Sequence, residues 1–299
     1  MKKNKIIAII EYIAARSFYT MINIIPLGFA LFIGRSLGVM LYKIDKRHAK
    51  NTLNNLKIAF SDKSEEEIKQ IALNFYKNLG MVFIEIFRLN KYNVSNIDNF
   101  VEGDFSELNG IYGKTGILLL TAHFDNWELL AKTFSLKGYQ GNVLARPLDN
   151  IYIERILYNL RTNTGNSVIY NRENAVKNIL SALNNHEIVG FLPDENASKR
   201  IGVFVNFFGI PACTMPGIAN IAAKTKAPVV PAFTIRSKDD PRKHKLIVQK
   251  PLRIEYTGKK KEDMMTILNM FNKTIEDMIK QHPEQWFWIH NRWKTKPEN

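Results

Sequence analysis

The chain has 299 residues, of which 45% are hydrophobic, so it is long enough to bury one large core. It contains a single cysteine, Cys213, which excludes an internal disulfide and a zinc site built from cysteines. Its formal net charge of +14 favours polyanionic partners, but nucleic acid is not expected among them, because the sequence has no zinc-finger spacing, no aromatic RNA-binding strand and no evident helix-turn-helix.

The N-terminal fifty residues predict a helical segment that associates with a membrane. Residues 17–34 carry no charge, which is about the shortest run that spans a bilayer, although Asn23, Pro26 and two glycines interrupt it. The basic residues that follow are typical of a flank facing anionic lipids: Lys43, Lys46, Arg47 and Lys50. The segment therefore predicts one short membrane helix or a kinked amphipathic pair lying in the interface, and an ordinary buried helix is the alternative.

A long amphipathic helix is expected next, over residues 61–89, starting at a capping box of Ser64 and Glu67. From residue 99 onward, strand and helix patterns alternate. Strands are expected at 99–103, 116–123, 141–147, 167–171, 188–195, 228–237 and 244–255, and helices at 127–139, 151–165, 175–187, 216–227 and 261–283. This alternation predicts an α/β fold with a largely parallel sheet flanked by helices. We expect a membrane-associating segment over residues 1–50 and an α/β domain over residues 51–299.

Polar side chains stand at the ends of three of these strands. His123, Arg146 and Asp194 each follow an apolar run. Ligands of open α/β sheets bind beyond the carboxyl ends of the strands, so these side chains are candidates for one site.

The stretch "HFDNWE" suggests how the histidine could act. Residues five apart do not share a face of a helix, so His123 can meet Glu128 only from the turn before the helix. With Asp125 as N-cap, Glu128 would point back and orient the imidazole, which could then take a proton from a substrate hydroxyl. The alternatives are a capping box without a catalytic role and a structural histidine.

A metal site is a weaker interpretation of these residues, since no H-E-x-x-H motif or second cluster accompanies them, and no metal or cofactor is expected. The C-terminal "WFWIHNRW" could stack on nucleic-acid bases, but core packing or a membrane interface is favoured.

The motifs resemble a known family. "HFDNWE" resembles the H-x4-D/E block of glycerolipid-type acyltransferases, and its Trp before the acid is similar to the late acyltransferases of lipid A biosynthesis and the related phosphatidylinositol mannoside acyltransferases. Further blocks follow in family order over nearly the whole chain: "RHAKNTLNNLKIAF", "NLGMVFIEIFRL", "ARPLDN", "LRTNTGNSVI", "FLPDENA", "VNFFGIPACTMPGIANIAAKTKAPVVPAF" and "HPEQWFWIHNRWKT". The sequence departs from the pattern at Glu195, where the family has Gln, and at Asp125, where Gly is common.

The resemblance implies a glycerolipid-acyltransferase-like fold and transfer of an acyl chain from an acyl-carrier-protein thioester to a hydroxyl of a lipid A precursor. It assigns His123 as general base and Glu128 as its orienter. The substrate-binding residues that it implies are Arg161 for the oxyanion or a phosphate, Arg146 and Asn150 lining the same cleft, and Asp194 orienting Arg161 or the acceptor.

The charge and the apolar N-terminus fit that expectation. Acyl carrier protein is acidic and lipid A precursors are phosphorylated, so both suit a chain of net charge +14. The expected location is the cytoplasmic face of the inner membrane, and an apolar groove would set the acyl chain length. Two alternatives remain: a phospholipid or glycolipid acyltransferase that uses acyl-CoA, and a non-catalytic lipid-binding protein on the same scaffold.

Overall fold

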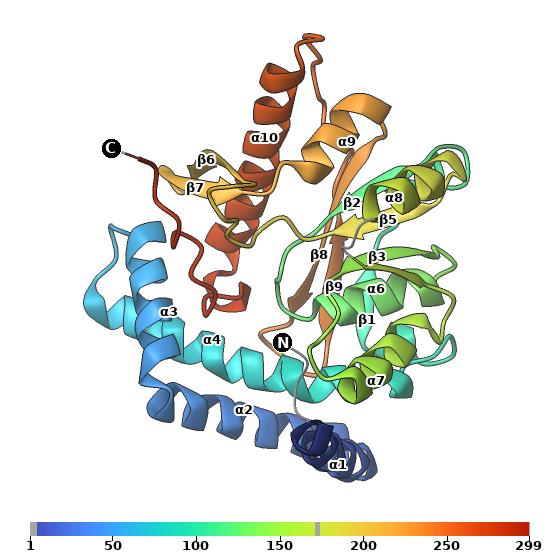
Figure 1. The fold of residues 1–299 in the computed structure, drawn as a ribbon. Coiled ribbons are helices and arrows are strands. Elements are labelled where there is room, and N and C mark those ends of the chain that lie inside the picture. Colours follow the sequence, from blue (N-terminus) through green and yellow to red (C-terminus); the bar gives the residue numbers. More distant parts are fainter. Residues whose placement is uncertain (1–4, 171–173, 299) are drawn as a thin grey trace.

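The computed structural model describes residues 5–170 and 174–298, and its centre is a seven-stranded sheet of order β1-β9-β8-β2-β5-β3-β4 (Figure 1). The strands of this sheet are β1 Val101–Gly103, β2 Ile117–Leu120, β3 Gly141–Ala145, β4 Ser167–Tyr170, β5 Ile188–Phe191, β8 Val229–Arg236 and β9 His244–Val248. All neighbouring pairs are parallel except β8 with β9. The predicted α/β fold with a largely parallel sheet is confirmed; Asn171, the last residue of one expected strand, lies outside the described residues.

The helices are α1 Lys5–Ile24, α2 Leu27–Ile44, α3 Lys46–Ala59, α4 Glu65–Ile86, α5 Ser106–Asn109, α6 Trp127–Leu136, α7 Ile151–Thr162, α8 Ala175–Asn184, α9 Gly217–Thr225 and α10 Lys260–Gln281, with short 3-10 turns at Leu89–Lys91, Ile97–Asn99 and Pro283–Gln285. The capping box of Ser64 and Glu67 at the start of α4 is confirmed. The boundary expected at residue 50 falls inside α3.

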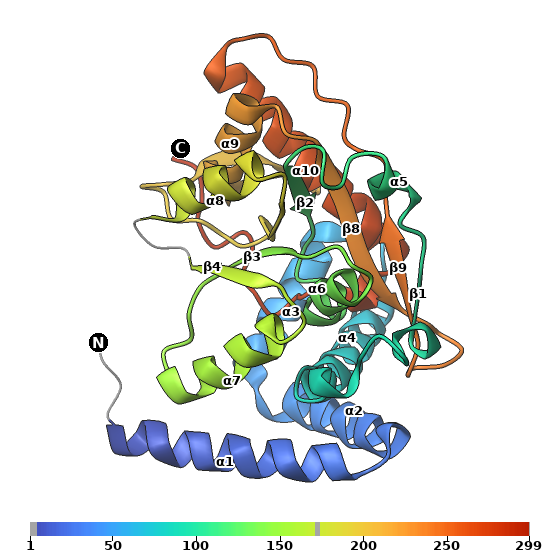
Figure 2. The same cartoon turned by 90° about the vertical axis from the view of Figure 1, so that its right-hand side faces the viewer.

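The central strand β2 is apolar throughout, and helices cover it on both faces of the sheet. Ile117 and Leu119 of β2 pack in one cluster with side chains of α6 and α7, while Leu118 and Leu120 join the opposite cluster with α8, α9 and α10. The views in Figures 1 and 2 show these helices on the two sides of the sheet. The molecule is therefore a three-layer α/β structure around β2.

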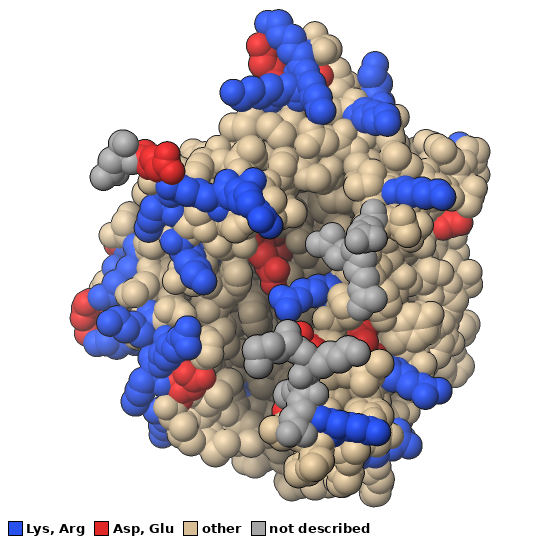
Figure 3. Space-filling model, viewed as in Figure 1, with Lys and Arg blue, Asp and Glu red and all other residues tan. Residues whose placement is uncertain are grey.

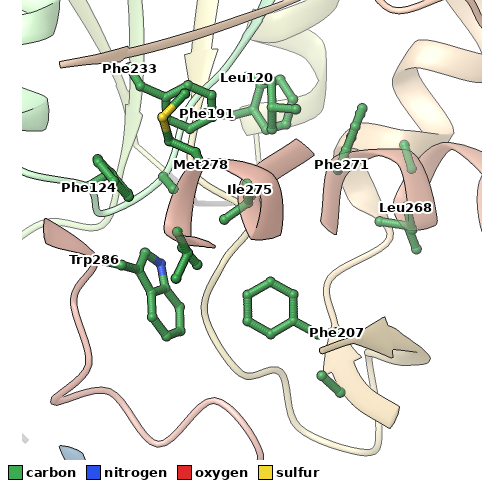
Figure 4. Packing of buried hydrophobic residues seen from close by; sticks show 14 of the residues in the cluster. Leu120, Phe124, Phe191, Phe207, Phe233, Leu268, Phe271, Ile275, Met278 and Trp286 are labelled. Carbon is green, nitrogen blue, oxygen red and sulfur yellow. The ribbon is translucent and has the colours of Figure 1, made fainter. Parts of the chain in front are cut away.

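Aromatic side chains fill the cluster under α10, as Figure 4 shows. Phe191 of β5 lies against Phe271 of α10, with ring centroids 5.4 Å apart. Trp286 contacts Phe207 at 5.6 Å. The C-terminal aromatic stretch is thus largely core, since Trp286, Trp288 and Trp293 are all buried.

A two-stranded antiparallel hairpin, β6 Val203–Phe207 with β7 Ile210–Thr214, was not expected from the sequence. Its two turn residues, Phe208 and Gly209, both have positive φ, 53° and 75°. Such turns match the twist of a hairpin, but a phenylalanine in the left-handed region is an unusual turn signal.

The N-terminal segment forms two helices that meet at Pro26. The uncharged run 17–34 is thereby divided between α1 and α2, so one helix over that run is wrong and the kinked pair describes the backbone better. By length and composition, α2 is the helix among the described residues that could cross a membrane.

One side of α2 is packed tightly along α4. A Cβ on Gly34 would lie 2.5 Å from the Gly80 carbonyl oxygen, and a Cβ on Gly38 would lie 1.9 Å from that of Tyr76. The two helices therefore run antiparallel with their backbones in close approach, which only glycine permits at these positions.

Candidate active site

The three predicted strand-end residues follow three strands that are neighbours in the sheet. His123 follows β2, Asp194 follows β5 and Arg146 follows β3, and these strands are parallel and adjacent. The carboxyl ends of adjacent parallel strands meet at one edge, which brings side chains far apart in the sequence to a common site.

Asp194 holds the imidazole of His123. Its Oδ1 lies 3.0 Å from His123 Nδ1, and its Oδ2 accepts hydrogen bonds from the His123 backbone N–H at 2.9 Å and from Trp286 Nε1 at 2.8 Å. The Asp194 side chain is only 2% exposed, whereas that of His123 is 23% exposed. This arrangement fixes the proton on Nδ1 and leaves Nε2 toward the cavity as the basic nitrogen.

The charge of Asp194 also tunes the histidine. Burial by itself would lower the pKa of His123, but the nearby carboxylates together outweigh burial and raise this pKa; Asp194 contributes most, and Glu195 and Glu128 contribute less. The pKa of Asp194 is lowered in turn. Burial alone would raise this pKa, but the charge and hydrogen bonds of His123 outweigh burial. An anionic carboxylate that stabilises the imidazolium is the arrangement of a general base.

The structure thus gives His123 a different carboxylate partner from the one expected. Glu128, in the first turn of α6, is engaged by Arg161 of α7, whose Nε lies 2.9 Å from Oε2 and whose Nη2 lies 2.5 Å from Oε1. Both side chains are largely buried, and burial, which alone would lower the pKa of Arg161, is outweighed by Glu128, which raises it. Glu128 therefore orients Arg161, and Asp194, expected beside Arg161 or the acceptor, orients His123.

The expected N-cap is also wrong by one residue. Asn126, not Asp125, caps α6 by accepting a hydrogen bond from the Leu129 backbone N–H at 2.9 Å. Asp125 adopts a left-handed conformation with φ 40°. Glycine adopts this conformation without strain, whereas an aspartate does so at a cost that its buried ionic contacts can offset.

Asp125 belongs to a buried ionic network behind the turn. Its Oδ2 lies 2.7 Å from His244 Nδ1, while His244 Nε2 lies 3.2 Å from Glu85 Oε1. Arg236 donates two hydrogen bonds of 2.7 Å to Glu85. With carboxylates at both ring nitrogens, His244 is held as the imidazolium, and two anions balance two cations. Because Asp125 is two residues from His123, the network connects the turn that carries His123 to α4, β8 and β9.

The remaining two expected site residues differ in position. Arg146 lines the mouth of the main cavity, with an 83% exposed side chain that pairs with Asp149 at 3.6 Å. Asn150 does not line that cavity: it caps α7 and donates hydrogen bonds to the Ala8 carbonyl at 2.9 Å and to Glu11 at 2.8 Å. Asn150 thus attaches α1 to the domain instead of contacting the cleft.

A cavity of about 750 Å³ opens at these residues. Its charged lining includes His123, Glu128, Arg161 and Glu195. The deeper wall is apolar and includes Ile86, Leu119, Phe134, Ile188, Leu268 and Phe271. The face shown in Figure 3 is hollowed near its centre, where side chains of both charges lie. A charged mouth above an apolar interior suits a substrate with a reactive head and a hydrocarbon chain.

Three aromatic side chains beside the site were not predicted to contact it. Trp286 donates to Asp194, while the Trp127 and Phe287 rings lie 5.0 and 6.0 Å from the His123 ring. The available signals were the position of Trp127 in "HFDNWE" and the position of Trp286 and Phe287 in the C-terminal block of the resemblance. In the part of the chain that the structure describes, no group of three His, Cys, Asp or Glu residues is placed to hold a metal ion.

The chain is similar in sequence to known proteins over most of its length. The profile of the family described as bacterial lipid A biosynthesis acyltransferase matches residues 2–295. The chain is 29% identical to the lipid A biosynthesis lauroyltransferase of Escherichia coli strain K12, over 89% of this chain and 85% of the relative. It is 24% identical to the palmitoleoyltransferase of that strain, over 91% and 87%, and 22% identical to its myristoyltransferase, over 87% and 79%. Because the family model covers almost the whole chain, the chain belongs to the bacterial lipid A biosynthesis acyltransferase family.

Proposed function

We propose that this acyltransferase moves a fatty acyl chain from an acyl-carrier-protein thioester to a hydroxyl of a lipid A precursor, on the cytoplasmic face of the inner membrane. The observation that carries the proposal is the His123–Asp194 pair at the mouth of an apolar cavity of about 750 Å³. Acyl transfer to a hydroxyl needs a base beside the reacting carbonyl group and an apolar space for the hydrocarbon chain attached to it. His123 and this cavity supply both.

The chemical step uses one base and no covalent enzyme intermediate. His123 Nε2 removes the proton of the acceptor hydroxyl while its oxygen forms a bond to the thioester carbonyl carbon. The carbonyl oxygen becomes an oxyanion. When this tetrahedral intermediate collapses, the carbon–sulfur bond breaks, and the imidazolium returns the proton to the departing thiolate.

Arg161 is placed to stabilise the charge that develops. Its Nε and Nη2 are occupied by Glu128, and the side chain also lines the cavity, so its remaining N–H groups are available to the oxyanion or to a substrate phosphate. The buried pairing fixes the guanidinium in advance of substrate binding, which is how an electrostatic stabiliser avoids reorganisation.

The names of the relatives support the choice of substrates. The matched proteins are lauroyl-, palmitoleoyl- and myristoyltransferases of lipid A biosynthesis. The surplus of positive charge, +14 over the chain, suits an acidic carrier protein as donor and a phosphorylated lipid as acceptor.

The N-terminal helices support an interfacial attachment to the membrane. The outward sides of α1 and α2 carry exposed apolar side chains: Ile6, Ile7, Ile9, Ile10, Ile13, Met21, Ile24, Phe29, Phe32, Met40, Leu41 and Ile44. Since α2 packs along α4, whose other side enters the domain core, a spanning α2 would draw part of that core into the bilayer. We infer that the two helices lie in the plane of the membrane surface.

An acyl-transfer assay on detergent-purified protein tests the reaction. A lipid A precursor is offered with acyl-carrier-protein donors of several chain lengths or with the matching acyl-CoA donors. Wild type is expected to use the carrier-protein donors, and His123→Gln to lose about a hundredfold or more in rate because the base is removed. His186→Asn is the matched control, as His186 is exposed and absent from the lining of the cavity.

The outcomes separate the parts of the proposal. Full activity in His123→Gln would contradict the assigned base. Transfer from acyl-CoA but not from acyl carrier protein would overturn the donor, and activity only toward other lipid hydroxyls would overturn the acceptor.

A further inference from the structure

A second cavity, of about 360 Å³, lies between the end of α2, α3 and the beginning of α4. Its lining is Tyr42, Lys43, Lys46, Ala49, Lys50, Leu53, Asn54, Lys57, Glu65, Ile68 and Lys69, and none of these residues lines the active-site cavity. It is therefore a separate site that the acyl-transfer chemistry does not use.

The rim of this cavity carries an uncompensated positive charge. Five lysines line it, with Glu65 as the single carboxylate. Glu65 pairs with Lys57 at 2.7 Å and with Lys69 at 3.8 Å. The remaining three lysines are exposed and form no ion pair with any residue that the structure describes; these are Lys43, Lys46 and Lys50.

The floor of the cavity is largely apolar. Leu53 of α3 is partly buried, and Ile68 of α4 is fully buried. Tyr42 also lines the cavity, with its ring 5.2 Å from that of Tyr76. Ammonium groups around an apolar floor suit a ligand that has a compact anionic group joined to apolar carbon.

The cavity adjoins the apolar surface of α2. In the last turns of this helix Met40 is 50%, Leu41 is 39% and Ile44 is 70% exposed, and Lys43 stands among them. Figure 3 shows basic side chains gathered over α3 at the left, beside a lower surface that is largely uncharged over α1 and α2. Cations at the border of an apolar surface lie where phosphates are found in a bilayer.

We propose that this cavity binds the phosphate headgroup of an anionic phospholipid in the membrane on which the chain rests. Lys43, Lys46 and Lys50 surround the phosphate, and the glycerol and first acyl carbons lie against the apolar floor and the end of α2. An acidic protein would satisfy the lysines but would leave the adjoining apolar side chains of α2 uncovered. The inference rests on the membrane attachment in the proposed function and adds the lipid class and its site.

Vesicle flotation of the full chain measures this site. The vesicles contain phosphatidylcholine alone or with about one-third phosphatidylglycerol, so that surface charge is the variable. The triple variant Lys43→Gln, Lys46→Gln and Lys50→Gln is compared with Lys259→Gln, Lys260→Gln and Lys261→Gln, which removes the same charge at the start of α10, the opposite end of the molecule from α1 and α2 (Figure 1).

The cavity lysines are expected to dominate binding to the anionic vesicles. The first triple variant should lose about tenfold or more of the affinity gained from phosphatidylglycerol, and the α10 variant should retain most of it. Equal losses in the two variants would mean that net charge alone attracts the membrane and would overturn the proposal.

A substitution that preserves charge tests whether the headgroup enters the cavity. Asn54 is exposed and lines the cavity, so Asn54→Trp fills its mouth without altering the lysines. The preference for phosphatidylglycerol should fall, while binding to phosphatidylcholine stays. An unchanged preference would overturn the proposed site. Circular dichroism verifies folding of each variant.

The outcomes also distinguish this inference from the proposed function. Wild type that binds both kinds of vesicle equally would overturn the headgroup site and leave the membrane attachment standing, whereas wild type that binds neither would overturn both. In detergent, the lysine variants should transfer acyl chains at the wild-type rate, because none of these lysines lines the active-site cavity.

Discussion

Asp194 has three hydrogen-bond donors around one carboxylate, two from His123 and one from Trp286. Its position is therefore fixed independently of the substrate, and its charge acts directly on the imidazole. Because burial alone would lower the pKa of His123, the raised pKa of this histidine depends mainly on Asp194. The exposed Glu195, next to Asp194, makes a smaller contribution to the pKa of the same ring.

Asp194→Asn keeps the shape of the side chain and removes its charge. The proposed mechanism requires neutral His123, so kcat/KM is expected to rise with pH through the pKa of this residue. Without the Asp194 charge, that pKa falls and the rising limb moves to lower pH. The plateau should fall by about 10²- to 10⁴-fold, since the imidazolium loses its stabilising anion. Measuring kcat/KM against pH gives both quantities.

Glu195→Gln is the matched control for this change. Glu195→Gln should move the rising limb of the kcat/KM profile to lower pH by a smaller amount than Asp194→Asn does, because Glu195 makes a smaller contribution to the pKa of His123. The plateau value of kcat/KM should stay near that of wild type. A rising limb that stays in place in Asp194→Asn would show that His123 is not the group whose titration limits the rate.

At the level of elements, the buried network joins four parts of the chain through ion pairs. Glu85 comes from α4, Asp125 from the turn that carries His123, Arg236 from β8 and His244 from β9. All four side chains are at most 4% exposed. Removing one partner of such a set leaves an unbalanced buried charge, which is far more destabilising than the loss of a surface pair.

The network predicts a pH-dependent stability. Burial would lower the pKa of His244, but Glu85 and Asp125 raise it from the usual 6.5 to about 9. A pKa that is raised in the folded state contributes stability that is complete below pH 6.5 and is lost as pH rises through 9. The melting temperature of wild type should therefore fall over that interval.

His244→Gln provides the comparison for this prediction. It should be less stable than wild type at neutral pH, by about 3 kcal/mol or more, because Asp125 and Glu85 lose one of their two cations and only Arg236 remains to balance them. The difference between the two proteins should shrink toward pH 9, and taking the difference cancels groups that titrate in both. A gap that stays constant from pH 6.5 to 9 would mean that His244 is not charged in the folded protein.

The pairing of α2 with α4 makes opposite predictions for two glycines of one helix. A Cβ at Gly38 would lie 1.9 Å from the Tyr76 carbonyl oxygen, whereas a Cβ at Gly28 meets nothing within 4 Å. Gly38→Ala should force α2 away from α4 and lower the melting temperature. Gly28→Ala should be neutral or stabilising by up to about 1 kcal/mol, through helix propensity alone.

Limited proteolysis of α2 and thermal unfolding in detergent would measure this contrast. If Gly38→Ala were as stable and as resistant to protease as Gly28→Ala, the close packing of α2 on α4 would not hold in solution. The inference that α2 lies on the membrane surface would then lose its main support.

At the scale of the whole molecule, the sequence predicted which residues stand at strand ends but not which of them touch. Local patterns locate the ends of β2 and β5, but the order of strands in the sheet places β5 beside β2, and no local pattern contains that order. For this reason the partner of His123 was expected five residues away at Glu128 and is instead Asp194, 71 residues along the chain.

Other differences arise where two residues have the same local propensity. Asp125 and Asn126 are both good N-caps, and the buried cations around Asp125 decide between them by recruiting its carboxylate. The turn of the β6–β7 hairpin places Phe208 in a conformation that sequence statistics assign to glycine or asparagine. In each case tertiary contacts override the local preference.

In the proposed function the cavity at His123 holds the acyl chain, so its lining predicts how chain length is selected. Gly190 of β5 lines the cavity on the same side of the strand as Ile188, and a Cβ there would meet only the Asn142 carbonyl oxygen, at 3.8 Å. A methyl group therefore has room at this position without displacing the sheet, and a longer side chain is expected to extend into the cavity that Gly190 lines. Gly190 is consequently a position where volume can be added to the wall at little risk to the fold.

Gly190→Leu should shorten the preferred acyl chain, because its side chain occupies space that the end of a long chain needs. The ratio of kcat/KM for the longest accepted donor to that for a donor two carbons shorter should fall by about tenfold or more. The ratio for Gly190→Ala should lie between those of Gly190→Leu and wild type. Gly110→Ala is the control, since Gly110 lies outside the cavity lining and a Cβ there meets no atom within 4 Å, and its ratio should equal that of wild type. A lower rate with an unchanged ratio would place the acyl chain elsewhere, whereas a graded shift over these variants would assign this wall of the cavity to the end of the chain.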